Sequence, residues 1–512
     1  MDYVIGCDIG SQSAKVVLAE LDGALVGAAS ENYGIDYPQP LWAEQPAERW
    51  TNALTLAVRR LLAETGVSAE QVRALGLATQ VDGVVPLDRA GQPLRPALIW
   101  MDRRASAQCD GVRATLGNEA AFRLTGLNLD PSHVAPKIRW IADHQPEIYE
   151  RTAYFLLPGS YLAFHLTGEI AVDYSNASST LLMDVRTRTW SPELCERFGV
   201  ERDRLARIDA ATAPLGRLQP SVAEALGLKA GTLVVVGCGD EHAACLGAGV
   251  VRPGLVGDIA GTAEPVCAAT PSPIFDPTRL VETHCHADPA LWLMENPGFV
   301  SGGNLRWYRD HFSPLEVRAD DDLKQSPYQL LDAQAARISP GAKGLIFLPC
   351  LMGALAPTWN EAARGAFVGF TLAHTRAHFT RAILEGSAYA VRDITDQMQG
   401  MGLELEEIRV VGGGARSRLW NQIKADVTGL PVAAPQIIET TALGGALLAL
   451  VGIGAYDRLA EACEQTVRVR ERFEPQPEAQ AAYAELYPLY RQTYFSLLPV
   501  FEQAARLHRP GL

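Results

Sequence analysis

Short apolar runs separated by tight turns dominate the start of the chain. Residues 3–9 and 15–21 are rich in aliphatic and β-branched side chains, which favours β-strands. Asp22-Gly23 is a strong tight-turn signal, and residues 25–29 can return as a third strand. The first thirty residues therefore predict a β-meander that places the Gly10-Ser11 turn at one hairpin tip.

Helical periodicity first appears after Pro46. The apolar residues that follow it recur on one helical face, and Gly66 stands just past the last of them. They are Trp50, Leu54, Ala57, Val58, Leu61 and Leu62. Residues 72–78 and 97–100 read as strands again, whereas residues 103–230 look more helical and irregular.

The strand pattern returns in the second half of the chain. Residues 233–236 predict a strand and residues 241–247 a helix, and from about residue 257 a new series of strands begins. Residues 408–411 predict a strand that leads into a run of three glycines and then a helix over residues 417–427. We expect two domains, residues 1–250 and 251–512, with similar architecture.

Two helices are expected near the end of the chain. Residues 441–450 form a small-residue segment that can pack closely against a neighbour. The tail from about residue 475 is helical in pattern and carries four tyrosines that we expect to serve packing. They are Tyr483, Tyr487, Tyr490 and Tyr494.

Composition narrows the class of protein. The 512 residues carry a net charge of −14, which argues against general binding to nucleic acid but leaves anionic ligands open. Nine cysteines without CxxC spacing indicate reduced thiols. The N-terminus shows no signal-peptide pattern, and the longest uncharged apolar stretch, residues 344–356, is too short to span a bilayer. We expect a cytoplasmic protein that does not associate with membranes.

Asp8 follows an apolar strand and precedes Gly10, Ser11 and Ser13. Glycine permits close approach of backbone to a phosphate, and the turn amides and hydroxyls can donate hydrogen bonds to it. Asp8 could hold Mg²⁺, which favours one or two carboxylates together with substrate phosphates. The alternative is an ordinary hairpin with a turn aspartate. A P-loop motif does not occur in the sequence.

Asp240 stands at the end of a second apolar strand, after Gly237 and Gly239. The glycines leave space for a substrate, and a carboxylate there could take the proton from an attacking hydroxyl. The alternative is that Asp240 only caps the helix that follows. Two such aspartates, far apart in sequence, are what transfer of a phosphoryl group between two bound substrates would require.

Further glycine turns and aromatic clusters add weaker signals. Gly261-Thr262, Gly302-Gly303 and Gly412-Gly413-Gly414 could hold a nucleotide against backbone, or could be plain turns. Sugar sites combine aromatic rings with carboxylates and amides, and three segments show that mixture. They are Trp42-Ala43-Glu44-Gln45, Gln80-Val81-Asp82 and Trp100-Met101-Asp102-Arg103, each of which could also be a surface turn.

His284-Cys285-His286 invites a metal interpretation. Alternating residues of a strand point to opposite faces, so Cys285 faces away from both histidines. With no second ligand pair evident in the sequence, we interpret the segment as structural.

Taken together and in order, these motifs resemble the FGGY carbohydrate kinases over nearly the whole length, from Val4 to about Gly454. The segments that carry the resemblance lie at both strand-end aspartates, around both tryptophan motifs and at glycine-containing segments of the C-terminal half. They are residues 5–11, 41–45, 96–103, 239–240, 261–262, 384–386, 412–417 and 442–446. Among family members the chain looks most like the xylulokinases.

The resemblance implies an α/β actin–hexokinase fold, with two ribonuclease-H-like domains around a catalytic cleft. It implies that Mg·ATP phosphorylates a terminal hydroxyl of a small sugar, D-xylulose above all. By alignment, Asp240 is the catalytic base and contributes with Asp8 to the metal site. The nucleotide-contacting positions are Gly10, Ser11, Ser13, Thr262, Gly302, Gly413 and Gly414, and the substrate-contacting positions are Trp42, Gln80, Val81, Asp82, Trp100, Asp102, Asp240 and Glu241. The expected partners are ATP and the sugar, with a homodimer left open.

The sequence departs from the family pattern in three places. Ser11 replaces the usual threonine but keeps the hydroxyl. Val81-Asp82 stands where xylulokinases carry Met-His, and Glu241 stands where Asn or Gln is common. These differences leave the type of reaction intact and leave the sugar open, with ribulose, erythrulose or glycerol as alternatives. An actin-fold ATPase that acts as a switch is the alternative from another class.

Overall fold

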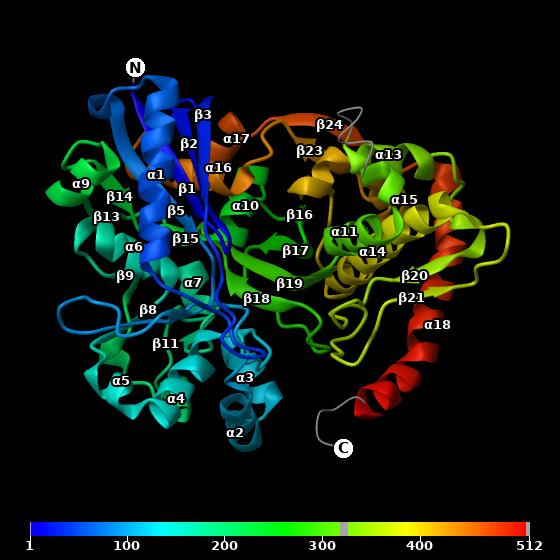
Figure 1. Cartoon of the computed structure of the whole chain (residues 1–512), viewed down its shortest axis with the longest axis horizontal. Helices are drawn as coiled ribbons and strands as arrows, with labels where there is room; N and C mark the ends of the chain where they lie inside the picture. Colours follow the sequence, from blue (N-terminus) through cyan, green and yellow to red (C-terminus); the bar gives the residue numbers. More distant parts are fainter. Residues whose placement is uncertain (1, 318–325, 508–512) are drawn as a thin grey trace.

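Two mixed β-sheets organise the molecule, and Figure 1 shows them side by side, one in each half. The computed structural model describes residues 2–317 and 326–507. The first sheet has the order β13-β14-β5-β1-β2-β3, with β15 paired to β5 beyond the end of β14. Its strands are β1 (Tyr3–Ile9), β2 (Ser13–Glu20), β3 (Leu25–Asn32), β5 (Val72–Thr79), β13 (Pro214–Arg217), β14 (Leu233–Val235) and β15 (Cys238–Gly239). The predicted N-terminal meander is confirmed.

The second sheet has the order β18-β19-β17-β16-β22-β23-β24. Its strands are β16 (Leu255–Ile259), β17 (Ala263–Thr270), β18 (Glu282–Cys285), β19 (Trp292–Val300), β22 (Glu407–Val411), β23 (Val432–Pro435) and β24 (Val469–Phe473). Within it, β19, β17 and β16 form an antiparallel meander, and β16 then pairs in parallel with β22, as β22 does with β23. In the first sheet, the neighbouring strands β3-β2-β1-β5-β14 show the same order of pairings, two antiparallel and then two parallel. The two halves therefore share one architecture, as expected.

Five two-stranded ribbons complete the β-structure of the described residues. They are β4 (Glu44–Gln45) with β7 (Ala97–Leu98), β6 (Val85–Leu87) with β8 (Tyr154–Leu156), β9 (Ala171–Asp173) with β12 (Arg207–Asp209), β10 (Met183–Asp184) with β11 (Thr189–Trp190), and β20 (Ile346–Leu348) with β21 (Ala366–Val368). The strand predicted over residues 97–100 is shorter than expected, because the Asp102 amide donates to the Ile99 carbonyl at 2.9 Å and turns the chain.

Ten helices precede the second sheet in sequence. They are α1 (Glu48–Thr65), α2 (Ser106–Leu116), α3 (Asn118–Thr125), α4 (Val134–His144), α5 (Pro146–Arg151), α6 (Pro158–Thr167), α7 (Tyr174–Ser178), α8 (Pro192–Phe198), α9 (Pro220–Leu226) and α10 (Asp240–Ala248). The helix predicted after Pro46 is α1, and it ends as predicted at Gly66, whose φ of 67° and amide bond to Leu62 make a left-handed cap. The irregular helical region predicted over residues 103–230 is also confirmed.

The described helices of the second half are α11 (Gly302–Phe312), α13 (Pro327–Ala335), α14 (Arg376–Gly400), α15 (Arg418–Thr428), α16 (Thr440–Gly452), α17 (Leu459–Thr466) and α18 (Pro477–Leu507). The small-residue helix α16 packs against both α10 and strands β1 and β5 of the first sheet. A Cβ atom at Gly444 would lie 2.0 Å from the Ala243 carbonyl oxygen, so only glycine permits this approach of α16 to α10. Although α16 comes late in the sequence, it supports the N-terminal sheet.

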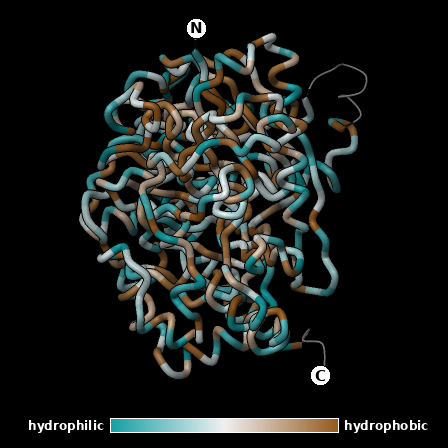
Figure 2. The backbone as a smooth tube through the Cα atoms, turned by 90° about the vertical axis from the view of Figure 1, so that its left-hand side faces the viewer, coloured by the Kyte–Doolittle hydropathy of each residue, from teal (hydrophilic) through white to brown (hydrophobic). Residues whose placement is uncertain are grey.

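Hydrophobic stretches concentrate in the interior and hydrophilic ones in the peripheral loops (Figure 2). The four tyrosines of α18 are buried, as the pattern predicted: Tyr483, Tyr487, Tyr490 and Tyr494. No helix among residues 2–317 and 326–507 is long and apolar enough to cross a membrane. The division into domains at residues 250 and 251 stays a prediction.

Candidate functional site

The two strand-end aspartates come together at one edge of the first sheet. Strand β5 lies between β1 and β15 and is parallel to both. In this register Asp8 and Cys238 flank Ala78, and one residue further on Ile9 and Gly239 flank Thr79. Asp240 follows Gly239 directly, so both carboxylates belong to the same end of the sheet.

Asp8 is a partly exposed carboxylate whose surroundings disfavour its charge. Burial raises its pKa to about 6, although Lys15, its direct cross-strand partner, acts in the opposite direction. Lys15 also forms an ion pair with Glu439 at 3.3 Å, and Glu439 further raises the pKa of Asp8. The site therefore contains a carboxylate whose charged form a bound cation would stabilise.

Asp240 is the first residue of α10, and Gly239 takes the N-cap position, so the capping alternative for Asp240 is wrong. Its Oδ1 accepts the Glu241 amide at 3.0 Å. Burial raises the pKa of Asp240 well above its ordinary value, and the carboxylates of Glu241 and Asp8 raise it further. A carboxylate with a raised pKa suits a proton acceptor.

The turn after β1 is held by a network of amide and hydroxyl groups. The Gly10 amide donates to the Ser13 carbonyl at 3.1 Å, which closes the turn. Gln45 Nε2 donates to the Ser11 carbonyl at 2.7 Å, and Gln80 Nε2 donates to Gln45 Oε1 at 3.0 Å. Gln80 is buried, so its amide positions the turn in this structure.

The indole of Trp100 donates from Nε1 to Ser11 Oγ at 2.7 Å. Trp100 is 42% exposed, whereas its indole N–H is engaged by the turn. Trp100, which we expect to contact the sugar, thus contacts Ser11, which we expect to contact phosphate. Both residues therefore fit one continuous site.

The glycine turns of the second half converge in the same way. The amides of Gly302 and Gly303 donate to the carbonyls of Gly261 and Thr262, each at 3.1 Å. The Gly414 amide donates to the Ala260 carbonyl at 2.9 Å, which joins the third glycine turn to the same segment. The structure therefore brings together the C-terminal residues predicted to contact nucleotide: Thr262, Gly302, Gly413 and Gly414.

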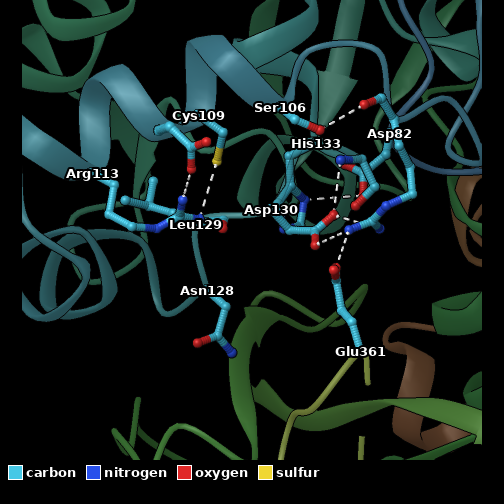
Figure 3. Close-up of polar contacts among 12 residues, drawn as sticks. Asp82, Ser106, Cys109, Arg113, Asn128, Leu129, Asp130, His133 and Glu361 are labelled. Carbon is cyan, nitrogen blue, oxygen red and sulfur yellow. Dashed lines mark hydrogen bonds and ion pairs between the residues drawn. The ribbon is translucent and has the colours of Figure 1, made fainter. Parts of the chain in front are cut away.

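Asp82 lies in a buried polar cluster shown in Figure 3. Its two carboxylate oxygens contact Ser179 Oγ at 2.8 Å and His133 Nδ1 at 3.1 Å. Its φ of 57° is left-handed, a conformation that aspartate tolerates better than most residues. Val81, before it, lies against Gly239, where an added Cβ would be 2.7 Å from Val81 Cγ1. Residues 81 and 82 are thus adjacent to the Asp240 segment.

His133 is the charged partner of Asp82. Burial alone would lower the pKa of His133, but the Asp82 carboxylate outweighs it and the pKa is raised to about 9. Close by, Arg103 binds Asp130 with two hydrogen bonds of 3.1 and 2.9 Å and reaches Glu361 of the second half at 3.0 Å (Figure 3). An ion pair therefore links the two halves beside this cluster.

Trp42 and Asp102 meet at Arg104. The guanidinium lies 3.6 Å from the centroid of the Trp42 ring and 2.7 Å from Asp102 Oδ2. Asp102 is fully buried and also accepts the Ala43 amide at 2.7 Å. In this structure the two residues fix the loops around the site, and their direct contact with a sugar stays a prediction.

Glu241 faces the second sheet. Burial raises its pKa well above the ordinary value, and the nearby carboxyl group of Glu295 in β19 raises it further. Glu241 thus places a second buried carboxyl group with a raised pKa next to Asp240.

Several residues of the site escaped prediction from the sequence. His133, Ser179 and Arg104 reach it from distant segments, and only Arg104 adjoins a motif that the sequence singled out. The structure also places His242 of α10 and Glu295 of β19 beside His284, a grouping that was not evident in the sequence. No short sequence spacing could reveal these partners.

Two family models match the chain. The FGGY family of carbohydrate kinases, N-terminal domain, matches residues 3–247, and the corresponding C-terminal domain matches residues 259–453. The chain belongs to the FGGY family of carbohydrate kinases. The protein is accordingly a phosphotransferase with the actin–hexokinase fold, and the resemblance predicted from its motifs is confirmed.

Individual relatives differ in their substrates. The chain is 32% identical to the xylulose kinase of Escherichia coli over 502 residues, 97% of this chain and 99% of that protein. It is also 32% identical to the autoinducer-2 kinase of Yersinia enterocolitica over 512 residues, 98% of this chain and 96% of that protein. The solved xylulose kinase from Rhodospirillum rubrum superposes with a TM-score of 0.88 at 29% identity, covering 98% of this chain and 100% of that one.

Sugar kinases of this family use ATP and a divalent metal ion. The residues at the sheet edge fit such an ion by their chemistry, because Asp8 and Asp240 are oxygen donors. Burial raises the pKa of both groups, and the Asp8 carboxylate raises the pKa of Asp240 further. Mg²⁺ prefers one or two carboxylates completed by phosphate oxygens and waters. The donor set thus suits a metal that arrives with the nucleotide.

Proposed function

We propose that this protein transfers the γ-phosphoryl group of Mg·ATP to a terminal hydroxyl of D-xylulose. The observation that carries the proposal is the pairing of Asp8 and Asp240 at one sheet edge, on either side of β5. Xylulose kinases among the relatives that cover nearly the whole chain support the choice of sugar. The cytoplasm is the proposed location, in keeping with nine unpaired cysteines.

In the proposed mechanism Asp240 orients the sugar hydroxyl and takes its proton as the new P–O bond forms. Its raised pKa makes it a better base than an ordinary aspartate. The hydroxyls of Ser11 and Thr262 donate to the phosphate oxygens as charge develops on them. Asp8 and Asp240 would hold Mg²⁺, which neutralises phosphate charge when bound.

The sugar side supports a small polyhydroxylated ligand. Trp100 presents an exposed ring beside Ser11, and Asp82 and Glu241 add carboxyl groups near Asp240. The carboxyl at residue 82 is already bonded to His133 and Ser179, so it can accept from a sugar hydroxyl only through its remaining lone pairs. The limited number of free lone pairs on Asp82 would favour sugars with one particular configuration at the hydroxyl that it contacts.

A coupled assay of ADP release tests the proposal directly. The purified protein is given Mg·ATP with D-xylulose, D-ribulose, erythrulose, glycerol or the substrate of the autoinducer-2 kinases. We expect the highest kcat/KM with D-xylulose and little ADP release without sugar. A higher kcat/KM for another compound would replace xylulose as the substrate, and release independent of every compound would favour an ATPase switch.

A further inference from the structure

Three buried side chains with unused ligand atoms meet behind the Asp240 segment. His242 lies in the first turn of α10, His284 in β18 and Glu295 in β19. One potential ligand atom of each lies within 4.8 Å of the other two. Within residues 2–317 and 326–507 this is the one group of three such residues that converges in this way.

Strand register explains why two of them share a face. Glu295 lies directly opposite Glu282 in the antiparallel pair of β19 and β18. His284 is two residues from Glu282, so all three side chains point to the same side of the sheet. Helix α10 covers that side and supplies His242, whose ring centroid is 5.9 Å from that of His284.

The polar atoms of the cluster lack adequate partners. The exposed fractions of His242, His284 and Glu295 are 2%, 5% and 2%. Neither ring nitrogen of either histidine has a well-formed hydrogen bond, nor does Glu295 Oε2. His242 only approaches the Cys285 backbone, and His284 Nε2 is 3.8 Å from Glu282. Buried polar groups in native proteins almost always have a partner, so these atoms point to a ligand.

The chemistry of the surrounding side chains favours a cation. Glu241, Glu282 and Glu295 surround the cluster, and within the described part of the chain no lysine or arginine forms an ion pair with any of them.

We propose that His242, His284 and Glu295 bind a divalent transition-metal ion of the zinc class, separate from the magnesium of the nucleotide. Two imidazoles and one carboxylate match three-ligand zinc sites, which leave a fourth position open, whereas Mg²⁺ prefers oxygen donors. Tetrahedral zinc needs ligand atoms about 3.4 Å apart, so small side-chain rotations close the site. The ion ties the first turn of α10, and hence Asp240, to the second sheet.

Metal binding to the untagged full-length protein tests this site without any assay of activity. The protein is stripped with a chelator and titrated with ZnCl₂ or CoCl₂ in excess Mg²⁺. We expect about one equivalent of zinc by elemental analysis, and visible Co²⁺ absorption typical of four-coordinate nitrogen and oxygen ligation. Less than about a tenth of an equivalent, or displacement by Mg²⁺, would overturn the proposal.

Matched variants assign the ligands. H284Q and E295Q should each weaken zinc binding at least about 100-fold and abolish the Co²⁺ spectrum. C285S is the control, because Cys285 lies on the same strand with its thiol toward the Val185 carbonyl, and it should bind as the wild type does. Unchanged binding in both E295Q and H284Q would refute the assignment. If one variant fails to fold, the other variant and the wild-type titration still test the proposed zinc site.

Discussion

Trp100 Nε1 donates a hydrogen bond to Ser11 Oγ at 2.7 Å. The bond joins the loop after β7 to the turn after β1, so an aromatic residue expected to contact sugar is coupled to a hydroxyl expected to contact phosphate. A change at either end should therefore affect the use of both substrates.

We expect S11A to lower kcat/KM about 2- to 10-fold for both sugar and ATP, because one neutral hydrogen bond and one phosphate donor are lost. S11T, which restores the family's usual hydroxyl, should retain activity. W100F keeps an aromatic ring but removes the indole N–H donor. Steady-state kinetics of S11A, W100F and the double variant would measure the coupling between the two residues. Strict additivity would show that the bond does not matter to the reaction.

D240N should lower kcat about 10²- to 10⁴-fold, since the amide cannot accept the hydroxyl proton. KM for the sugar should change much less, and circular dichroism should report an intact fold. D203N is a suitable control because Asp203 is exposed in a short 3-10 turn. Near-normal turnover by folded D240N would exclude Asp240 as the base.

The His133–Asp82 pair should make stability depend on pH. Burial lowers and Asp82 raises the pKa of His133, with a net rise from 6.5 to about 9. The folded state then binds the proton more tightly than the unfolded state, so the stabilisation is complete below pH 6.5 and is lost as pH rises through about 9. The loss should be at most about 3 kcal/mol.

Urea unfolding at pH 6.5 and pH 10 measures this difference, and H133Q should reduce it. The exposed His311, whose contacts are with Trp307 of its own helix, supplies the control variant H311Q. An H133Q protein with the wild-type dependence on pH would contradict the assignment.

Gly413 is exposed, and an added Cβ there would meet no atom within 4 Å. G413A should fold with normal stability but raise KM for ATP about tenfold, because the methyl group would occupy space proposed for the nucleotide. G400A, where an added Cβ also meets nothing, should leave KM unchanged. Thermal unfolding and ATP titrations separate the effects, and an unaltered KM in G413A would remove Gly413 from the nucleotide site.

Local sequence determined much of this protein. The β1–β2 turn, the Gly66 cap of α1, the small-residue helix α16 and both strand-end aspartates follow from turn chemistry, periodicity and residue size, which act within a few positions of the chain. Their order and spacing were also sufficient to indicate the family.

Tertiary structure decided which of these segments meet. The insertion of β5 between β1 and β15 brings Asp8 and Asp240 to one edge, and the pairing of β18 with β19 under α10 gives His284 its neighbours His242 and Glu295. Alternation along a strand predicts which face a side chain occupies but not which strand lies opposite. That choice depends on burying apolar surface between residues far apart in sequence, which no local pattern records.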